Sequence, residues 1–217
     1  QTGPSRDQAG HDLNYMAETG VLGLSCGTTA TPVIPPALIA DIGAGAYPAL
    51  INILLALSER DRSGTGRHLD ISMTDNLFPF MYWALAQGLS TGKWPGNGMA
   101  MVTGGSPRYR LYATGDGNFL AAAPLEDRFW RNFCDAIGLE EELRLAEADP
   151  IAVASRVEAI IRGKPAAEWA ERLGSTDCCC AIVASVQEAL AHPHFQARGM
   201  WEKTVTGPGA HESIALP

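Results

Sequence analysis

Apolar residues recur at helical spacing from Ile42 to Arg60, and this period predicts a long helix buried in a core. Glycines within residues 63–66 end the pattern, as is typical of a helix terminus. The alternating stretch Arg67 to Met73 predicts a short strand, and Asp75 to Leu89 predicts a second apolar helix. For His11 to Thr19 the pattern leaves open a short helix or an extended segment.

A different pattern begins after a segment rich in glycine, proline and asparagine. Two apolar runs, Tyr109 to Ala113 and Asn118 to Ala123, are joined by Thr-Gly-Asp-Gly and predict a β-hairpin, because glycine adopts the positive φ that tight turns need. The elements expected after the hairpin are helices over Asp127 to Ile137, Pro150 to Arg162, Ala166 to Leu173 and Val186 to Ala191, and a strand near Cys180 to Val183. Together these elements predict a mixed α/β fold of the α+β kind.

The glycine-rich segment is also the expected domain boundary, because the composition changes on either side of it. We expect residues 1–89 to belong to a larger, mostly helical domain that carries an active-site segment, and residues 90–107 to be a linker. In this division, residues 108–205 form a small α+β domain. Residues 206–217 are expected to be a loop that returns toward the larger domain.

Charge and composition restrict the partners. The 217 residues carry a formal net charge of -8, whereas a surface for nucleic acid or an anionic membrane needs clustered Lys and Arg. The apolar stretch 42–57 is short for a bilayer span and is interrupted by Gly43, Gly45 and Pro48. No basic, apolar leader opens the sequence. We therefore expect a small-molecule partner, no nucleic acid, no membrane and a cytoplasmic location.

The five cysteines show neither disulfide nor zinc spacing. Cys26 and Cys134 stand alone, while Cys178, Cys179 and Cys180 are consecutive and cannot all reach one ion without distortion. We expect reduced, structural cysteines and no metal site. Glycine-rich nucleotide-binding motifs and the nucleophile elbow of hydrolases are also missing from the sequence, which disfavours the classes built on them.

Three side chains are candidates for proton chemistry, and each has a structural alternative. His11 follows Gly10 and can act as a base near neutral pH, although a single histidine in such a setting is more often structural. Asp41 interrupts an apolar run just before the long helix, where it suits a helix cap and an active carboxylate equally. Glu126 opens a predicted helix, and there a carboxylate most often complements the helix dipole.

Several motifs agree in order and spacing with one known family. They are Gln1-Thr-Gly-Pro, Ala9-Gly-His-Asp-Leu-Asn-Tyr15, Ala40-Asp-Ile-Gly-Ala-Gly45, Leu57-Ser-Glu-Arg60, Gly104-Gly-Ser-Pro-Arg-Tyr109, Leu125-Glu126 and Ser175-Thr-Asp-Cys178. Through these motifs the chain resembles the family III CoA-transferase superfamily over nearly its whole length. The resemblance is closest to the α-methylacyl-CoA racemase branch.

The resemblance implies site residues, a fold and partners. The catalytic residues it implies are His11, Asp41 and Glu126, the last supporting the histidine, and the residues lining the thioester pocket are Gly10, Asp12 and Tyr15. It also implies the family III fold without its N-terminal Rossmann-like segment and its C-terminal tail. The substrate would be an acyl-CoA thioester, with no cofactor besides the CoA of that substrate. The resemblance further implies an interlocked homodimer in which Glu126 meets His11 across subunits.

Three activities remain open at this point. The first is racemisation of a 2-methylacyl-CoA or similar thioester by two bases, with His11 and Glu126 serving one face and Asp41 the other. Backbone N–H groups near Gly43 to Gly45 are the expected donors to the enolate oxygen. The second is CoA transfer with Asp41 as the acyl-accepting nucleophile. The third is a non-catalytic CoA-binding paralogue or an inactive fragment. Thr103 and the sequence Ala-Pro-Leu-Glu depart from the usual racemase pattern, which bears on acyl specificity.

Overall fold

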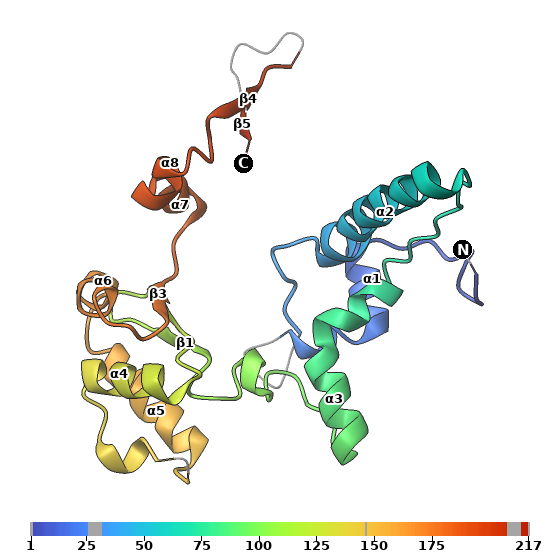
Figure 1. The fold of residues 1–217 in the computed structure, drawn as a ribbon. Helices are drawn as coiled ribbons and strands as arrows, with labels where there is room; N and C mark the ends of the chain where they lie inside the picture. The colour runs from blue at the N-terminus through green and yellow to red at the C-terminus, as the bar shows by residue number, and fades with distance from the viewer. Residues whose placement is uncertain (1, 26–31, 146, 208–213, 217) are drawn as a thin grey trace.

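The computed structural model describes residues 2–25, 32–145 and 147–207, together with the backbone of 214–216. Three parts follow one another along the chain: a helical region (residues 2–103), a small unit (108–183) and a C-terminal arm (184–207 with 214–216). Figure 1 shows the helical region and the small unit side by side and the arm extending away from the small unit. The helical region and the small unit each have their own buried hydrophobic cluster.

The helical region contains no long strand pairing among the residues that the structure describes. Its elements are α1 (Asp12–Thr19), the 3-10 turn η1 (Leu22–Leu24), the π-helix η2 (Ile39–Ala46), α2 (Tyr47–Ser63), the 3-10 helix η3 (Asp75–Met81), α3 (Tyr82–Thr91) and the 3-10 turn η4 (Met101–Thr103). The segment left open by the sequence is therefore a helix, which Gly20 ends at a φ of 87°. A small cluster of Met16, Ala40, Ala44 and Leu77 holds α1, η2 and η3 together.

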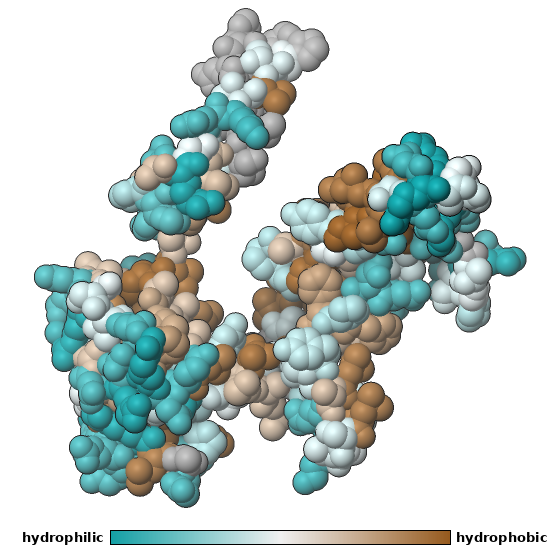
Figure 2. All heavy atoms as spheres, in the orientation of Figure 1, coloured by the Kyte–Doolittle hydropathy of each residue, from teal (hydrophilic) through white to brown (hydrophobic). Residues whose placement is uncertain are grey.

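The predicted long helix is present, but its expected burial is wrong. None of the residues of α2 is buried, and Leu54 and Leu55 remain 58% and 63% exposed. Figure 2 shows the resulting apolar surface along this helix. Helical periodicity reports that one face of a helix is apolar, and it carries no information about what covers that face.

The stretch Ile39–Ser63 also meets the length and composition of a membrane span, with 17% of its most apolar window buried. The core helix of a soluble protein meets the same requirement, so length and composition do not separate the two. The interruptions at Gly43, Gly45 and Pro48 did not prevent a continuous helical stretch, because they fall in the π-helix and in the first turn of α2.

Three further expectations need correction. Residues 67–73 form no strand, because no described segment pairs with them. The second predicted helix is divided into η3 and α3, and Pro79, which lacks a backbone N–H, lies within η3. Part of the expected C-terminal loop is a strand, since β4 (Lys203–Val205) pairs antiparallel with β5 (Ile214–Leu216).

The small unit is built on the predicted hairpin, which the structure confirms. Strands β1 (Arg110–Ala113), β2 (Phe119–Ala122) and β3 (Cys180–Ile182) form an antiparallel sheet in the order β1-β2-β3. Ala113 pairs with Phe119, and Gly117 turns the connection with a φ of 82°. Side chains alternate across the sheet, so Tyr112 and Leu120 are buried while Leu111 is exposed.

Helices cover the buried face of this sheet. They are α4 (Asp127–Ile137), the 3-10 turn η5 (Glu141–Leu143), α5 (Pro150–Ile161) and α6 (Ala166–Gly174). The arm carries α7 (Val186–Ala191) and α8 (Pro193–Ala197), which contact each other. Fourteen buried residues form one cluster between sheet and helices. The buried ring of Trp169 donates its N–H to the carbonyl of Ile161 at 2.8 Å, and Tyr112 donates its hydroxyl to Pro107 at 2.7 Å. The polar atoms of both rings are therefore satisfied.

Candidate active site

A buried carboxylate connects the two candidate bases of the helical region. Asp12 is only 7% exposed, and its Oδ1 accepts the backbone N–H groups of Ala40 at 2.6 Å and Asp41 at 3.0 Å. Hydrogen bonds to a charged group contribute about 1.5–3 kcal/mol each. Because Asp12 directly follows His11, these bonds hold His11 and Asp41 at the same end of the helical region.

His11 occupies the N-cap position of α1 with an extended backbone, φ -125° and ψ 174°. The side-chain oxygen of Asn14 accepts the N–H of His11 at 3.1 Å, and the backbone N–H of Asn14 donates to the His11 carbonyl at 2.8 Å. The His11 side chain makes no cap hydrogen bond and is exposed. The imidazole therefore does not cap the start of α1, which weakens the alternative that His11 has only a structural role.

Asp41 lies in the first turn of the π-helix η2 and is exposed. The N-cap of η2 is Leu38 and that of α2 is Ala46, so the capping alternative for Asp41 is wrong. π-helical turns are rare and occur frequently at functional sites.

The two glycines that follow Asp41 have a packing reason. A Cβ atom on Gly43 would come within 2.9 Å of the Phe80 ring, and one on Gly45 within 3.1 Å of the Met73 side chain. Their N–H groups lie inside the i→i−5 bonding that defines a π-helix. The expected donors to an enolate oxygen are therefore not available at Gly43 to Gly45.

Gly10 and Tyr15 contact one another beside His11. The Tyr15 hydroxyl donates to the Gly10 carbonyl at 2.9 Å. A Cβ atom on Gly10 would stand 2.8 Å from the Tyr15 ring, so glycine is required here for the ring to pack. This contact fixes the backbone directly before His11.

Glu126 is the N-cap residue of α4, with φ -74° and ψ 145°, yet its side chain makes no cap hydrogen bond. The residue is exposed, and the acid in the first turn of the helix is its neighbour Asp127. Figure 1 places α1 and α4 in separate parts of the molecule. Within one chain, the structure therefore brings His11 and Asp41 together and leaves Glu126 apart from both.

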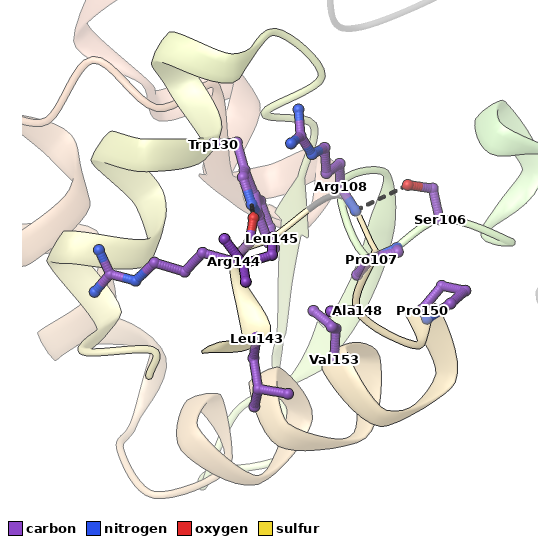
Figure 3. Close-up of a pocket in the computed structure, with 10 residues that line it drawn as sticks. All are labelled: Ser106, Pro107, Arg108, Trp130, Leu143, Arg144, Leu145, Ala148, Pro150 and Val153. Atoms are coloured by element: carbon purple, nitrogen blue, oxygen red, sulfur yellow. Dashed lines mark hydrogen bonds between the residues drawn. The ribbon is translucent and has the colours of Figure 1, made fainter. Parts of the chain in front are cut away.

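Two pockets border the small unit. One, of about 490 Å³ and mainly apolar, is lined by Leu24 and Ser25, by residues 102–104 and 109–111, by the last two alanines of β2 and by Ala123 after it. Its wall includes Thr103, which departs from the racemase pattern, and ends three residues before Glu126. The other, of about 210 Å³, lies between Arg108, Trp130 and Arg144 (Figure 3).

The cysteines of the small unit are structural in their surroundings. Cys134 and Cys178 are buried, and burial raises the pKa of the Cys134 thiol to about 12 and raises the pKa values of Cys178 and Cys180 as well. Cys179 is exposed at a φ of 51°. Cys26 lies outside the described residues, and across those that are described no three His, Cys, Asp or Glu side chains gather as a metal site.

Comparisons with known proteins identify the class to which this fold and site belong. The family model for CoA-transferase family III matches residues 1–217, and the chain belongs to that family. A CaiB/BaiF family protein from Brucella suis has the same fold, with a TM-score of 0.71 and 22% identity over 99% of this chain and 60% of that one.

Among more similar sequences, the α-methylacyl-CoA racemase of Mus musculus is 36% identical over 91% of this chain and 53% of its own length. The acetyl-CoA:oxalate CoA-transferase of Acetobacter aceti is 27% identical over 94% of this chain and 54% of its own. The chain thus spans about half the length of the curated relatives it matches. The family includes enzymes of both kinds.

Proposed function

We propose that this protein racemises 2-methylacyl-CoA-type thioesters by moving the proton on the carbon next to the thioester carbonyl. The observation that carries the proposal is the Asp12 bridge, which holds Asp41 next to the segment of His11. Both candidate bases have exposed side chains that cap no helix. Greater similarity to a racemase than to a CoA-transferase supports the same choice.

In the proposed reaction, His11 or Asp41 removes the α-proton, and the electron pair of the broken C–H bond forms an enolate. The protonated partner on the opposite face then donates its proton to the same carbon, which inverts the configuration. General bases must lie within hydrogen-bond reach of the proton they move, and a two-base reaction needs one on each face. The substrate enters and leaves with its thioester intact, so no acyl-enzyme forms.

Glu126 is assigned to support His11, as a carboxylate that fixes the imidazole tautomer and stabilises the imidazolium. Because α1 and α4 lie apart in one chain, this role requires Glu126 of a second copy to approach His11. We therefore include a homodimer in the proposal. An exposed carboxylate that caps no helix is suited to a contact outside its own unit.

Donors for the enolate oxygen are assigned to the start of α1 in place of the π-helix. The first N–H groups of an α-helix have no acceptor within the helix. In α1 these belong to Asp12 and Leu13, directly after His11. Preorganised backbone donors of this kind stabilise developing negative charge.

The test is α-deuterium exchange in deuterated water with each enantiomer of a 2-methylacyl-CoA. We expect exchange with both enantiomers in the parent protein, with one only in His11→Ala, and more weakly with the opposite one only in Asp41→Asn. Loss of exchange with both enantiomers in each variant, with folding intact, would contradict the two-base assignment.

The same experiment distinguishes the alternatives. A CoA-transferase would form a mixed anhydride at Asp41 that hydroxylamine traps, and His11→Ala would then have little effect. A non-catalytic CoA-binding paralogue would show neither exchange nor trapping in the parent protein.

A further inference from the structure

The backbone that carries Glu126 is a tight corner between β2 and α4. Its N-terminal side is fastened to the sheet, since the N–H of Ala123 donates to the carbonyl of Cys179 at 3.0 Å. The N–H of Leu125 then turns back to the carbonyl of Ala123 at 2.8 Å. Pro124, between them, is fully buried.

One guanidinium holds the corner on both sides of Glu126. Nη1 of Arg108 donates to the carbonyl of Leu125 at 3.0 Å and to Oδ1 of Asp127 at 2.6 Å. The hydrogen bond and charge of Arg108 also lower the pKa of the Asp127 carboxyl. Glu126 is the single residue between these two anchors.

Arg108 is itself fixed in place. Its guanidinium carbon lies 5.2 Å from the centre of the Trp130 ring, within the range of a cation–π contact. Trp130 is buried, and its indole N–H donates to the carbonyl of Arg144 at 3.3 Å. Figure 3 shows Arg108 next to the Trp130 ring at the wall of the smaller pocket.

We propose that Arg108 is a positioning residue for Glu126. Resting on the proposed function, this means that Arg108 aims the Glu126 carboxylate at the His11 imidazole without touching substrate. The guanidinium of Arg108 donates to the backbone of Leu125 and to the side chain of Asp127. Its charge therefore acts on the corner and not on the substrate. A displacement of about 1 Å in a supporting group can cost about 100-fold in rate.

An ion pair with Asp127 alone would not make this case, because Asp127 is 83% exposed and exposed pairs contribute little. The carbonyl of Leu125 is the second, independent contact, and it belongs to the backbone directly before Glu126. Asp127→Asn should therefore have a smaller effect than a change at Arg108, since it leaves the bond to Leu125 in place.

The experiment compares Arg108→Gln with the parent in α-deuterium exchange. We expect kcat to fall about tenfold or more for the enantiomer whose exchange depends on His11, with KM and the other enantiomer nearly unchanged. Arg108→Lys should recover part of the loss. Arg128→Gln is the matched control. Arg128 is an exposed arginine of α4 whose guanidinium pairs with Asp177 and not with the Leu125 carbonyl.

A double-mutant cycle with Glu126→Gln separates positioning from stability. If Arg108 acts through Glu126, Arg108→Gln causes little further loss in the Glu126→Gln background. The inference is overturned if Arg108→Gln lowers kcat by the same factor in both backgrounds, or if it leaves kcat unchanged. The proposed function stands in either case, provided that the parent protein exchanges the α-proton. Absence of exchange in the parent protein overturns both.

Discussion

The helical region and the small unit differ in how much of their apolar surface they bury by themselves. The small unit encloses fourteen buried residues in one cluster, with Trp169 and Tyr112 fully covered and hydrogen-bonded. The cluster of the helical region has four buried residues, Met81, Ala84 and Ala100 are buried outside it, and α2 has no buried residue. The small unit therefore provides a rigid base for Glu126, while His11 and Asp41 depend on a few specific contacts.

The comparison also separates two ways of positioning a functional group. On the small unit, Glu126 sits at a corner fixed by a sheet, a buried proline and Arg108. In the helical region, one buried carboxylate, Asp12, sets the position of Asp41. Removal of a buried apolar side chain should therefore lower stability most in the small unit. Removal of one polar side chain should affect the position of a candidate base most in the helical region.

The largest expected effect is at Trp169, which is 1% exposed. Trp169→Ala removes a buried ring and leaves a cavity, which costs about 3–5 kcal/mol. Denaturant unfolding followed on the small unit measures this loss. A cost below about 1 kcal/mol would show that the cluster can repack and that the small unit is less rigid than its burial indicates.

The second effect is at Asp12. Asp12→Ala leaves two N–H groups without their acceptor, at a cost of about 1–3 kcal/mol each where they stay buried, and releases Asp41 from its place beside His11. We expect faster hydrogen exchange in η2 and loss of α-deuterium exchange with the enantiomer that depends on Asp41. Asp7→Ala is the control, since Asp7 is exposed. Full activity in Asp12→Ala would remove the bridge from the mechanism.

A smaller effect on stability is expected on α2. Replacing both Leu54 and Leu55 by Ser changes exposed positions, so the free energy of unfolding of the 217-residue chain should change by no more than about 0.5 kcal/mol per residue. Binding of a hydrophobic dye should fall, because the apolar surface shrinks. A large destabilisation would instead show that α2 is covered in solution.

The smallest effect concerns Asp116, which is exposed in the turn of the hairpin. A hydrogen bond from Thr114, followed by one from the backbone of Ala166, lowers the pKa of its carboxyl. A lowered folded pKa stabilises the protein above the ordinary pKa of aspartate, and this contribution disappears as pH falls through the folded pKa. The urea midpoint of Asp116→Asn should therefore fall less than that of the parent as the pH falls below about 4, the ordinary pKa of aspartate. Parallel pH profiles would contradict the assignment.

The sequence was sufficient for the parts of the fold that depend on local signals. The hairpin at Gly117 and the helices of the small unit follow from turn chemistry and helical periodicity, and the structure confirms them. The family could be identified from motifs in order, and the family match confirms it. The candidates His11, Asp41 and Glu126 could be selected because they lie in motifs that resemble those of the family.

Only the tertiary structure decided how those candidates are held. In the sequence Asp12 is only the neighbour of a histidine, whereas its hydrogen bonds reach Ala40 and Asp41, 28 and 29 residues further along the chain. Arg108 likewise meets Leu125 and Asp127 only because the sheet returns the chain to it. The exposure of α2 and the missing strand at 67–73 have the same cause. Burial and strand pairing are contacts between distant segments, and the periodicity of one segment does not specify its partner.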